Sequence, residues 1–162
     1  MAIAAFTIYA NTKERLLLPA DRNRLRAFYR QSWLAFQAGQ PLEPLQALVA
    51  EVVAEHPEYH AQVLTADAVE REFSVAGGEV NPFLHMGMHV ALREQVAADR
   101  PAGLAEQYQK LAKRVGERHA SEHQMMECLG QVMWEAQRAG IAPDEKAFLN
   151  CVRRLRKAKR ST

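Results

Sequence analysis

All six histidines of the chain fall into three pairs with four-residue spacing: His56 and His60, His85 and His89, and His119 and His123. Six histidines placed at random over 162 positions would give only roughly 0.2 such pairs. Residues four apart share one face of an α-helix, so each pair can present two imidazoles to one point. Because imidazole is the commonest protein ligand for transition metals, this spacing predicts metal binding.

The pair His85 and His89 lies on the apolar face of a predicted helix, in line with Leu92 and Val96. Two adjacent neutral imidazoles would each need a donor and an acceptor partner once water is removed. Metal ligation meets that need, so we expect ligands here rather than two core histidines held only by hydrogen bonds.

The pair His119 and His123 is extended by Glu127, four residues further along the same helical stripe. One helix therefore offers two nitrogens and a carboxylate in a row. Histidine and glutamate at helical spacing build non-haem iron and manganese sites in helical bundles. Glu122 follows the turn on a different face, and we expect it to be a solvated charge or the partner of a lysine or arginine.

The pair His56 and His60 is interrupted by Pro57, which lacks a backbone donor and pushes His56 out of helical geometry. His56 could instead bond the carbonyls at the end of the preceding helix. The sequence leaves ligation by His60 and by His56 open, with His60 the better candidate. Glu51 and Glu55 are candidate carboxylates from the same helix.

The predicted ligands outnumber what one tetrahedral ion needs, which leaves two ions, or one ion with further imidazoles around it. Nitrogen-rich ligation argues against magnesium and calcium and favours iron first and zinc next, before copper, nickel and manganese. Four methionines beside the histidines would suit copper, although methionine at helical spacing is more often core: Met86, Met88, Met125 and Met126.

Caps, prolines and apolar periodicity predict an all-α fold, a bundle of four principal helices with shorter helices alongside. Helices are expected over 21–38, 44–55, 82–99, 101–115, 117–138 and from 143, with short helical turns within 58–73. Period-two alternation occurs only in about the first ten residues. We expect an N-terminal extension over 1–20, a metal-binding domain over 21–150 and a basic tail over 151–162.

Composition gives weaker limits on function. With 48% hydrophobic residues and a net charge of +2, the chain suits one domain and has no strong field toward nucleic acid or a membrane. No apolar run is long enough to span a bilayer. Cys128 and Cys151 lack framework spacing, so we expect free thiols and a cytoplasmic location. The sequence leaves open whether the chain forms a homodimer.

Three stretches together resemble one bacterial family, the domain of unknown function 1841: EHPEYH from Glu55, NPFLHMGMHVALREQV from Asn81 and HASEHQMMECLGQVMWEAQRA from His119. The resemblance runs from about Asp21 to the last helix. It implies a small cytoplasmic bacterial protein and no particular activity. More coarsely, the layout is similar to hemerythrin-like and DinB-like bundles that hold iron, zinc or nickel, and this likeness of architecture transfers no residue roles.

The leading hypothesis is a metal-binding bundle with a non-haem di-iron or zinc site, which keeps an open position for oxygen, peroxide or nitric oxide. One alternative is a structural or interaction protein in which zinc pins the helices. The other is a nucleic-acid adaptor that acts through its basic tail. We favour a solvated chain terminus as the explanation of this tail.

Overall fold

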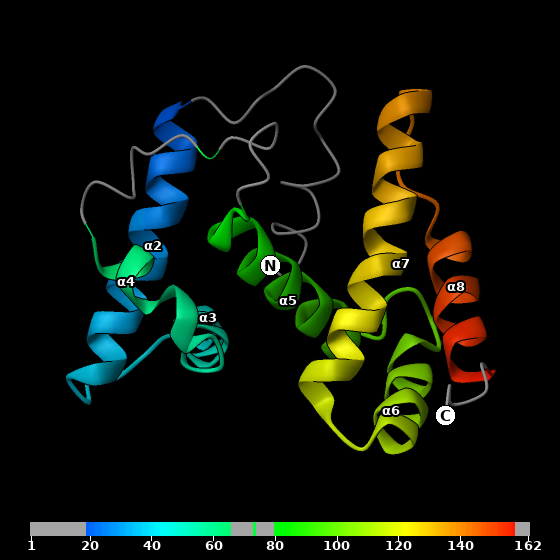
Figure 1. Ribbon diagram of the computed structural model, residues 1–162, viewed down its shortest axis with the longest axis horizontal. Helices are drawn as coiled ribbons and strands as arrows, with labels where there is room; N and C mark the ends of the chain where they lie inside the picture. The colour runs from blue at the N-terminus through cyan, green and yellow to red at the C-terminus, as the bar shows by residue number, and fades with distance from the viewer. Residues whose placement is uncertain (1–18, 66–72, 74–79, 158–162) are drawn as a thin grey trace. The chain divides into compact units, whose positions relative to one another are not determined.

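The structure, a computed structural model, describes residues 19–65, 73 and 80–157 (Figure 1). Its elements are α2 (Pro19–Gln37), α3 (Pro44–Ala54), the 3-10 turn η1 (Pro57–Tyr59), α4 (His60–Leu64), α5 (Pro82–Ala97), α6 (Leu104–Val115), α7 (Arg118–Ala139) and α8 (Glu145–Lys157). Within these residues every element is helical, so the predicted all-α fold is confirmed. The alternating first ten residues lie outside the described chain.

The chain divides into two compact units, and the boundary falls inside α5, between Val90 and Ala91. The N-terminal unit comprises the described residues up to Val90, with α2, α3, α4 and the first half of α5. The C-terminal unit comprises the described residues from Ala91, with α6, α7 and α8. Helix α8 continues to Lys157 and buries Val152, so the first half of the predicted basic tail is helical.

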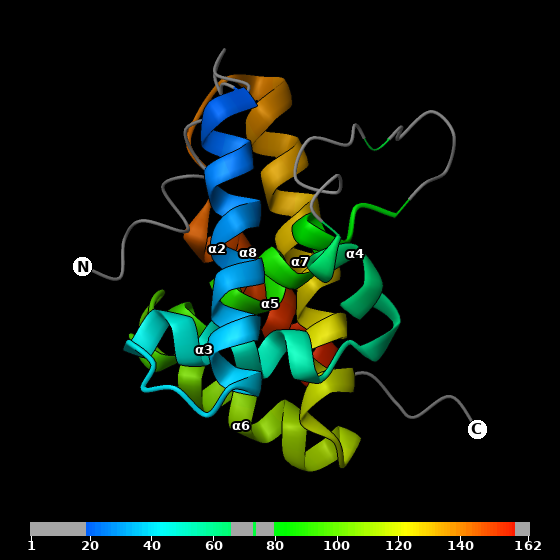
Figure 2. The same cartoon turned by 90° about the vertical axis from the view of Figure 1, so that its left-hand side faces the viewer.

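The N-terminal unit is built on contacts of α2 with α3 and α4, which can be followed in Figure 2. Pro44 occupies the first turn of α3, and the Glu43 N–H donates to the Gln46 side chain at 2.9 Å. The rings of Tyr29 and Phe83 meet edge to face at 5.9 Å. This unit's core is a cluster of buried side chains: Tyr29, Trp33, Val49, Val52, Val53, Val63, Phe83, Met86 and Val90.

The C-terminal unit packs α6, α7 and α8 against one another, and α8 returns alongside α7 in the opposite direction (Figure 1). Helix α6 begins at Leu104, three residues later than expected. Asp99 adopts a left-handed conformation, with φ of 48°, and its carboxylate accepts hydrogen bonds from the N–H groups of Gly103 and Ala105. Asp99 therefore caps α6, and the helix does not begin at Pro101 as the sequence suggested.

The two cysteines form a disulfide, so the expectation of free thiols is wrong. Cys128 on α7 and Cys151 on α8 have their Cα atoms 5.7 Å apart, at a sequence separation of 23. Antiparallel neighbouring helices bring such distant positions together, and sequence spacing alone does not show this. None of the helices in the described part of the chain is long and apolar enough to cross a membrane.

Candidate metal centre

The C-terminal end of α3 determines how His56 and His60 are used. Pro57 has no N–H to offer the carbonyl of Val53, and that oxygen accepts from the His56 N–H at 3.0 Å and has the His60 Nε2 at 2.8 Å. The His56 Nδ1 lies 2.6 Å from the carbonyl of Val52. Both imidazoles therefore complete the hydrogen bonding of α3, the capping role that the sequence offered for His56.

These bonds fix the proton positions, because a carbonyl oxygen can only accept. His56 must donate from Nδ1, so in the neutral ring Nε2 carries the lone pair. His60 must donate from Nε2, which leaves the lone pair on Nδ1. An Nδ1–H donated to a backbone carbonyl is the arrangement that commonly orients a metal-binding histidine.

Helix α5 brings two further imidazoles to His56. Asn81 caps this helix, since its Oδ1 accepts from the N–H groups of Phe83 and Leu84, as the sequence predicted. His56 lies with its ring centroid 5.0 Å from that of His85 and 4.8 Å from that of His89. Each of the three residues offers a ring nitrogen, and these nitrogens lie within 4.8 Å of one another. We call His56, His85 and His89 the histidine triad.

The histidine triad is largely removed from solvent. His56 is 1% exposed and His89 0% exposed, and His85 is half-buried. Buried imidazoles from two separate elements can surround one ion, and their burial keeps competing water ligands away. The structure therefore places three nitrogen donors of the N-terminal unit together, two from the α5 pair and one from the end of α3.

Tyr59 is a neighbour of the histidine triad that sequence reasoning missed. Its ring stacks on His56 at 5.7 Å, with 8° between the planes, and meets His85 at 5.7 Å. Burial, with a smaller effect of the Glu58 carboxylate, raises the pKa of the Tyr59 hydroxyl. The hydroxyl therefore stays protonated near neutral pH. Its position between His56 and His60 in the sequence was the available signal.

The C-terminal unit holds a second group, the α7 histidine pair of His119 and His123. Their Nε2 atoms lie 3.1 Å apart. Two nitrogens bound to one ion at 2.0–2.1 Å and at angles between 90° and tetrahedral would lie about 2.9–3.4 Å apart. The α7 histidine pair therefore has the spacing of a chelate, and the same distance also suits a hydrogen bond between the rings. His119 is half-buried and His123 is exposed.

Glu122, next to His123, is buried and paired, so the solvated alternative is wrong and the arginine-partner alternative is confirmed. Its carboxylate is 1% exposed and accepts from the Nε and Nη2 of Arg93, at 3.1 and 2.9 Å. It also accepts from the Tyr108 hydroxyl at 3.1 Å, and Arg118 donates to that hydroxyl oxygen. Burial raises the pKa of Tyr108, and the hydrogen bond to Tyr108 raises the pKa of Arg118.

The other predicted site residues do not join these groups. His60 turns its ring toward Trp33, at 4.6 Å between centroids, as well as toward the Val53 carbonyl. Glu127 is exposed on α7, and Glu51 and Glu55 are exposed near the end of α3. Among the described residues the ligand atoms that cluster are all imidazole nitrogens. Three nitrogen donors suit zinc, iron or copper and leave coordination positions for water or a small molecule.

Residues 21–154 match the model of a family described as "Domain of unknown function (DUF1841)". The match covers most of the chain and includes every histidine. No curated protein and no solved structure matches. The comparisons thus agree with the family resemblance of the sequence and give no support to the likeness with hemerythrin-like or DinB-like bundles.

Proposed function

The chain belongs to the DUF1841 family, and we propose from its own residues that it binds a transition-metal ion through clustered imidazoles. The observation that carries the proposal is the histidine triad, in which His56 from the end of α3 meets His85 and His89 of α5 with ring nitrogens within 4.8 Å. Four-residue spacing on one helix brings a pair together by itself. A third imidazole from another element requires the fold.

The observations support some of the proposed ligands more strongly than others. The histidine triad is supported by proximity and burial, and the α7 histidine pair by the 3.1 Å between its Nε2 atoms. Glu127 and His60, also expected from the sequence, have weaker support because Glu127 is exposed and His60 is bonded to the Val53 carbonyl.

Iron is the first candidate for the ion and zinc the second, because nitrogen-rich sites with open positions suit both. A bound iron would supply redox chemistry toward oxygen, peroxide or nitric oxide, and either ion would act as a Lewis acid. The residues of the chain would hold and orient the ion. Tyr59, packed on His56, would be a hydroxyl donor beside the site.

The deciding experiment is elemental analysis of the full chain purified without a histidine tag, with absorption spectra in air and under dithionite. We expect a stoichiometric transition metal in the native protein. The His85→Ala, His123→Ala double variant should lose this metal, because its affinity for the ion should be at least about tenfold weaker. Unchanged metal content in that variant would refute the proposal.

Single variants assign the ligands. His89→Ala tests the histidine triad, and His119→Ala tests the α7 histidine pair. His60→Gln is the matched control, because glutamine retains a donor for the Val53 carbonyl and the ring of His60 lies outside both groups. We expect metal loss in His89→Ala and retention in His60→Gln. Metal loss in His60→Gln with a normal circular dichroism spectrum would instead place His60 among the ligands.

A structural zinc site is the second candidate function. It is favoured by the place of His56, whose ring both completes the end of α3 and meets α5, so that an ion there would fasten one helix to the other. Colourless protein with tightly bound zinc and no spectral response to dithionite or oxygen would indicate this function in place of a reactive iron centre.

A further inference from the structure

We propose that the disulfide between Cys128 and Cys151 is a reversible redox site, which thiols reach through Cys151 from a pocket between α7 and α8. The inference does not depend on metal binding, because it rests on different residues. In reducing compartments disulfides are usually transient and regulatory, whereas in oxidising compartments they are structural. Exposed disulfides are more easily reduced than buried ones, so we compare the access to the two sulfur atoms.

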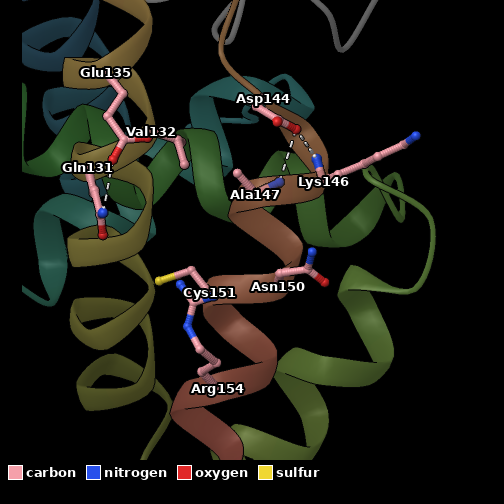
Figure 3. A pocket seen from close by; sticks show the side chains of 9 residues that line it. All are labelled: Gln131, Val132, Glu135, Asp144, Lys146, Ala147, Asn150, Cys151 and Arg154. Carbon is pink, nitrogen blue, oxygen red and sulfur yellow. Dashed lines mark hydrogen bonds between the residues drawn. The ribbon is translucent and has the colours of Figure 1, made fainter.

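The two cysteines differ in access. Cys128 is 2% exposed, whereas Cys151 is half-buried and lines a pocket of about 360 Å³. Figure 3 shows Cys151 on the pocket wall with its sulfur directed toward α7. Thiol–disulfide exchange requires a thiolate to reach one of the two sulfurs. Cys151 is therefore the sulfur that is attacked, and Cys128 is the leaving group.

Two cations, Arg154 and Lys146, and two carboxylates, Glu135 and Asp144, line the pocket, and the charge beside Cys151 is that of Arg154. Arg154 lies one helical turn after Cys151, and its side chain extends toward Cys151 in Figure 3. The carboxylate of Asp144 accepts from the N–H groups of Lys146 and Ala147 at 2.8 and 3.0 Å, so this acidic group serves as the cap of α8. A guanidinium beside a sulfur stabilises the thiolate form and attracts carboxylates.

The ligand class that fits is a small peptide thiol with carboxylate groups. Its thiolate attacks the Cys151 sulfur, the bond to Cys128 breaks, and Cys128 leaves as a thiolate that takes up a proton. A second thiol then attacks the ligand sulfur of the mixed disulfide and releases Cys151 as a thiol. In total two thiols are oxidised to one disulfide, and the protein disulfide is reduced by two electrons.

The test uses the oxidised full chain and reduced glutathione as the probe. Samples are quenched at short times with iodoacetamide, and the modified peptides are identified by mass spectrometry. We expect glutathione on Cys151 and the alkyl group on Cys128, at a rate proportional to the glutathione concentration. Glutathione on Cys128, or a rate independent of thiol concentration and equal to global unfolding, would overturn the proposal.

Charge variants test the role of the pocket. Arg154→Glu should slow the reaction with glutathione about fivefold, the size of one exposed charge interaction, and should change the reaction with neutral 2-mercaptoethanol less. Lys146→Glu is the matched control, because Lys146 lines the same pocket but its side chain points away from Cys151 in Figure 3. Equal slowing by both variants would show general charge repulsion and would contradict a directed approach to Cys151.

Discussion

Pro57 is the residue that separates the roles of His56 and His60. It has no N–H for the Val53 carbonyl, which accepts from the His56 N–H at 3.0 Å and also from the His60 ring. His56 bonds the Val52 carbonyl through Nδ1, which makes Nε2 its candidate ligand atom, and its ring lies 4.8 Å from that of His89 on α5. The sequence made His60 the better candidate ligand, whereas the contacts favour His56. Helical spacing could not show this, because the proline breaks the helix between the two residues.

The buried carboxylate of Glu122 leads to a prediction about stability. Glu122→Ala leaves Arg93, with a side chain only 9% exposed, without its bidentate partner. Breaking a buried ion pair from one side costs about 3 kcal/mol or more, so we expect a loss of that size in the free energy of unfolding, measured by urea denaturation.

Tyr108→Phe is the matched control for this loss, because it keeps the ion pair and removes only the hydroxyl, which donates to Glu122 and accepts from Arg118. It should cost about 1 kcal/mol. Adding Glu122→Ala to Tyr108→Phe should then cost less than Glu122→Ala alone, because the two residues share a hydrogen bond. Fully additive losses would mean that Glu122 does not act through this network.

At the scale of elements, prediction from the sequence succeeded where local signals decide. Asn81 with Pro82 marked the start of α5, and Pro57 marked the end of α3, because caps and prolines act within one helical turn. It failed at α6, where Asp99 takes a left-handed conformation and accepts hydrogen bonds from residues four and six positions ahead to form the cap. It also failed at the disulfide, which depends on how α7 and α8 pack.

The Asp99 cap predicts a specific pH dependence. Backbone hydrogen bonds from Ala105 and Gly103 lower the pKa of Asp99 below its ordinary value of 3.8. A carboxylate with a depressed folded-state pKa stabilises the fold above its unfolded pKa, and this contribution is lost as pH falls through the folded pKa. Asp99→Asn, which tolerates the left-handed backbone, should therefore flatten the acid limb of the unfolding free energy below about pH 4.

Asp99→Ala provides the comparison for that experiment. It removes the acceptor as well as the charge, so it should lower stability at all pH values, including those at which Asp99 is protonated. Urea denaturation between pH 2 and pH 7 separates the two variants. An acid limb of native steepness in Asp99→Asn would mean that other carboxylates control the acid sensitivity.

The disulfide predicts a second effect at this scale. A bridge across a sequence separation of 23 restricts the unfolded chain, so reducing it should lower the free energy of unfolding by about 3 kcal/mol. The reduced protein should stay helical, because α8 also packs on α6 and buries Phe148, Leu149 and Val152. Circular dichroism with and without reductant measures both effects. Complete loss of helix on reduction would contradict this expectation.

For the whole molecule, the sequence predicted the all-α fold, but it did not predict which histidines from separate elements come together. Two imidazoles on α5 and two on α7 follow from four-residue spacing, which is a local property. The meeting of His56 with the α5 pair depends on the packing of separate elements and has no signal in one sequence. The sequence also does not show which residues are exposed to solvent. Glu127 is an example, because it lies on the predicted ligand stripe of α7 but is exposed.

Metal binding should also raise the free energy of unfolding, and the chain's two tryptophans allow this rise to be measured separately in each unit. Trp33 is buried in the core of the N-terminal unit, whereas Trp134 is 55% exposed on α7, so Trp134→Phe leaves one reporter in the unit that holds the histidine triad. Free metal at a hundred times its Kd should raise the unfolding free energy by about 2.7 kcal/mol. We expect this rise in the Trp134→Phe variant, measured by urea denaturation with Trp33 fluorescence. The rise should be absent in the variant that carries both Trp134→Phe and His89→Ala. A rise that survives His89→Ala would place the ion away from the histidine triad.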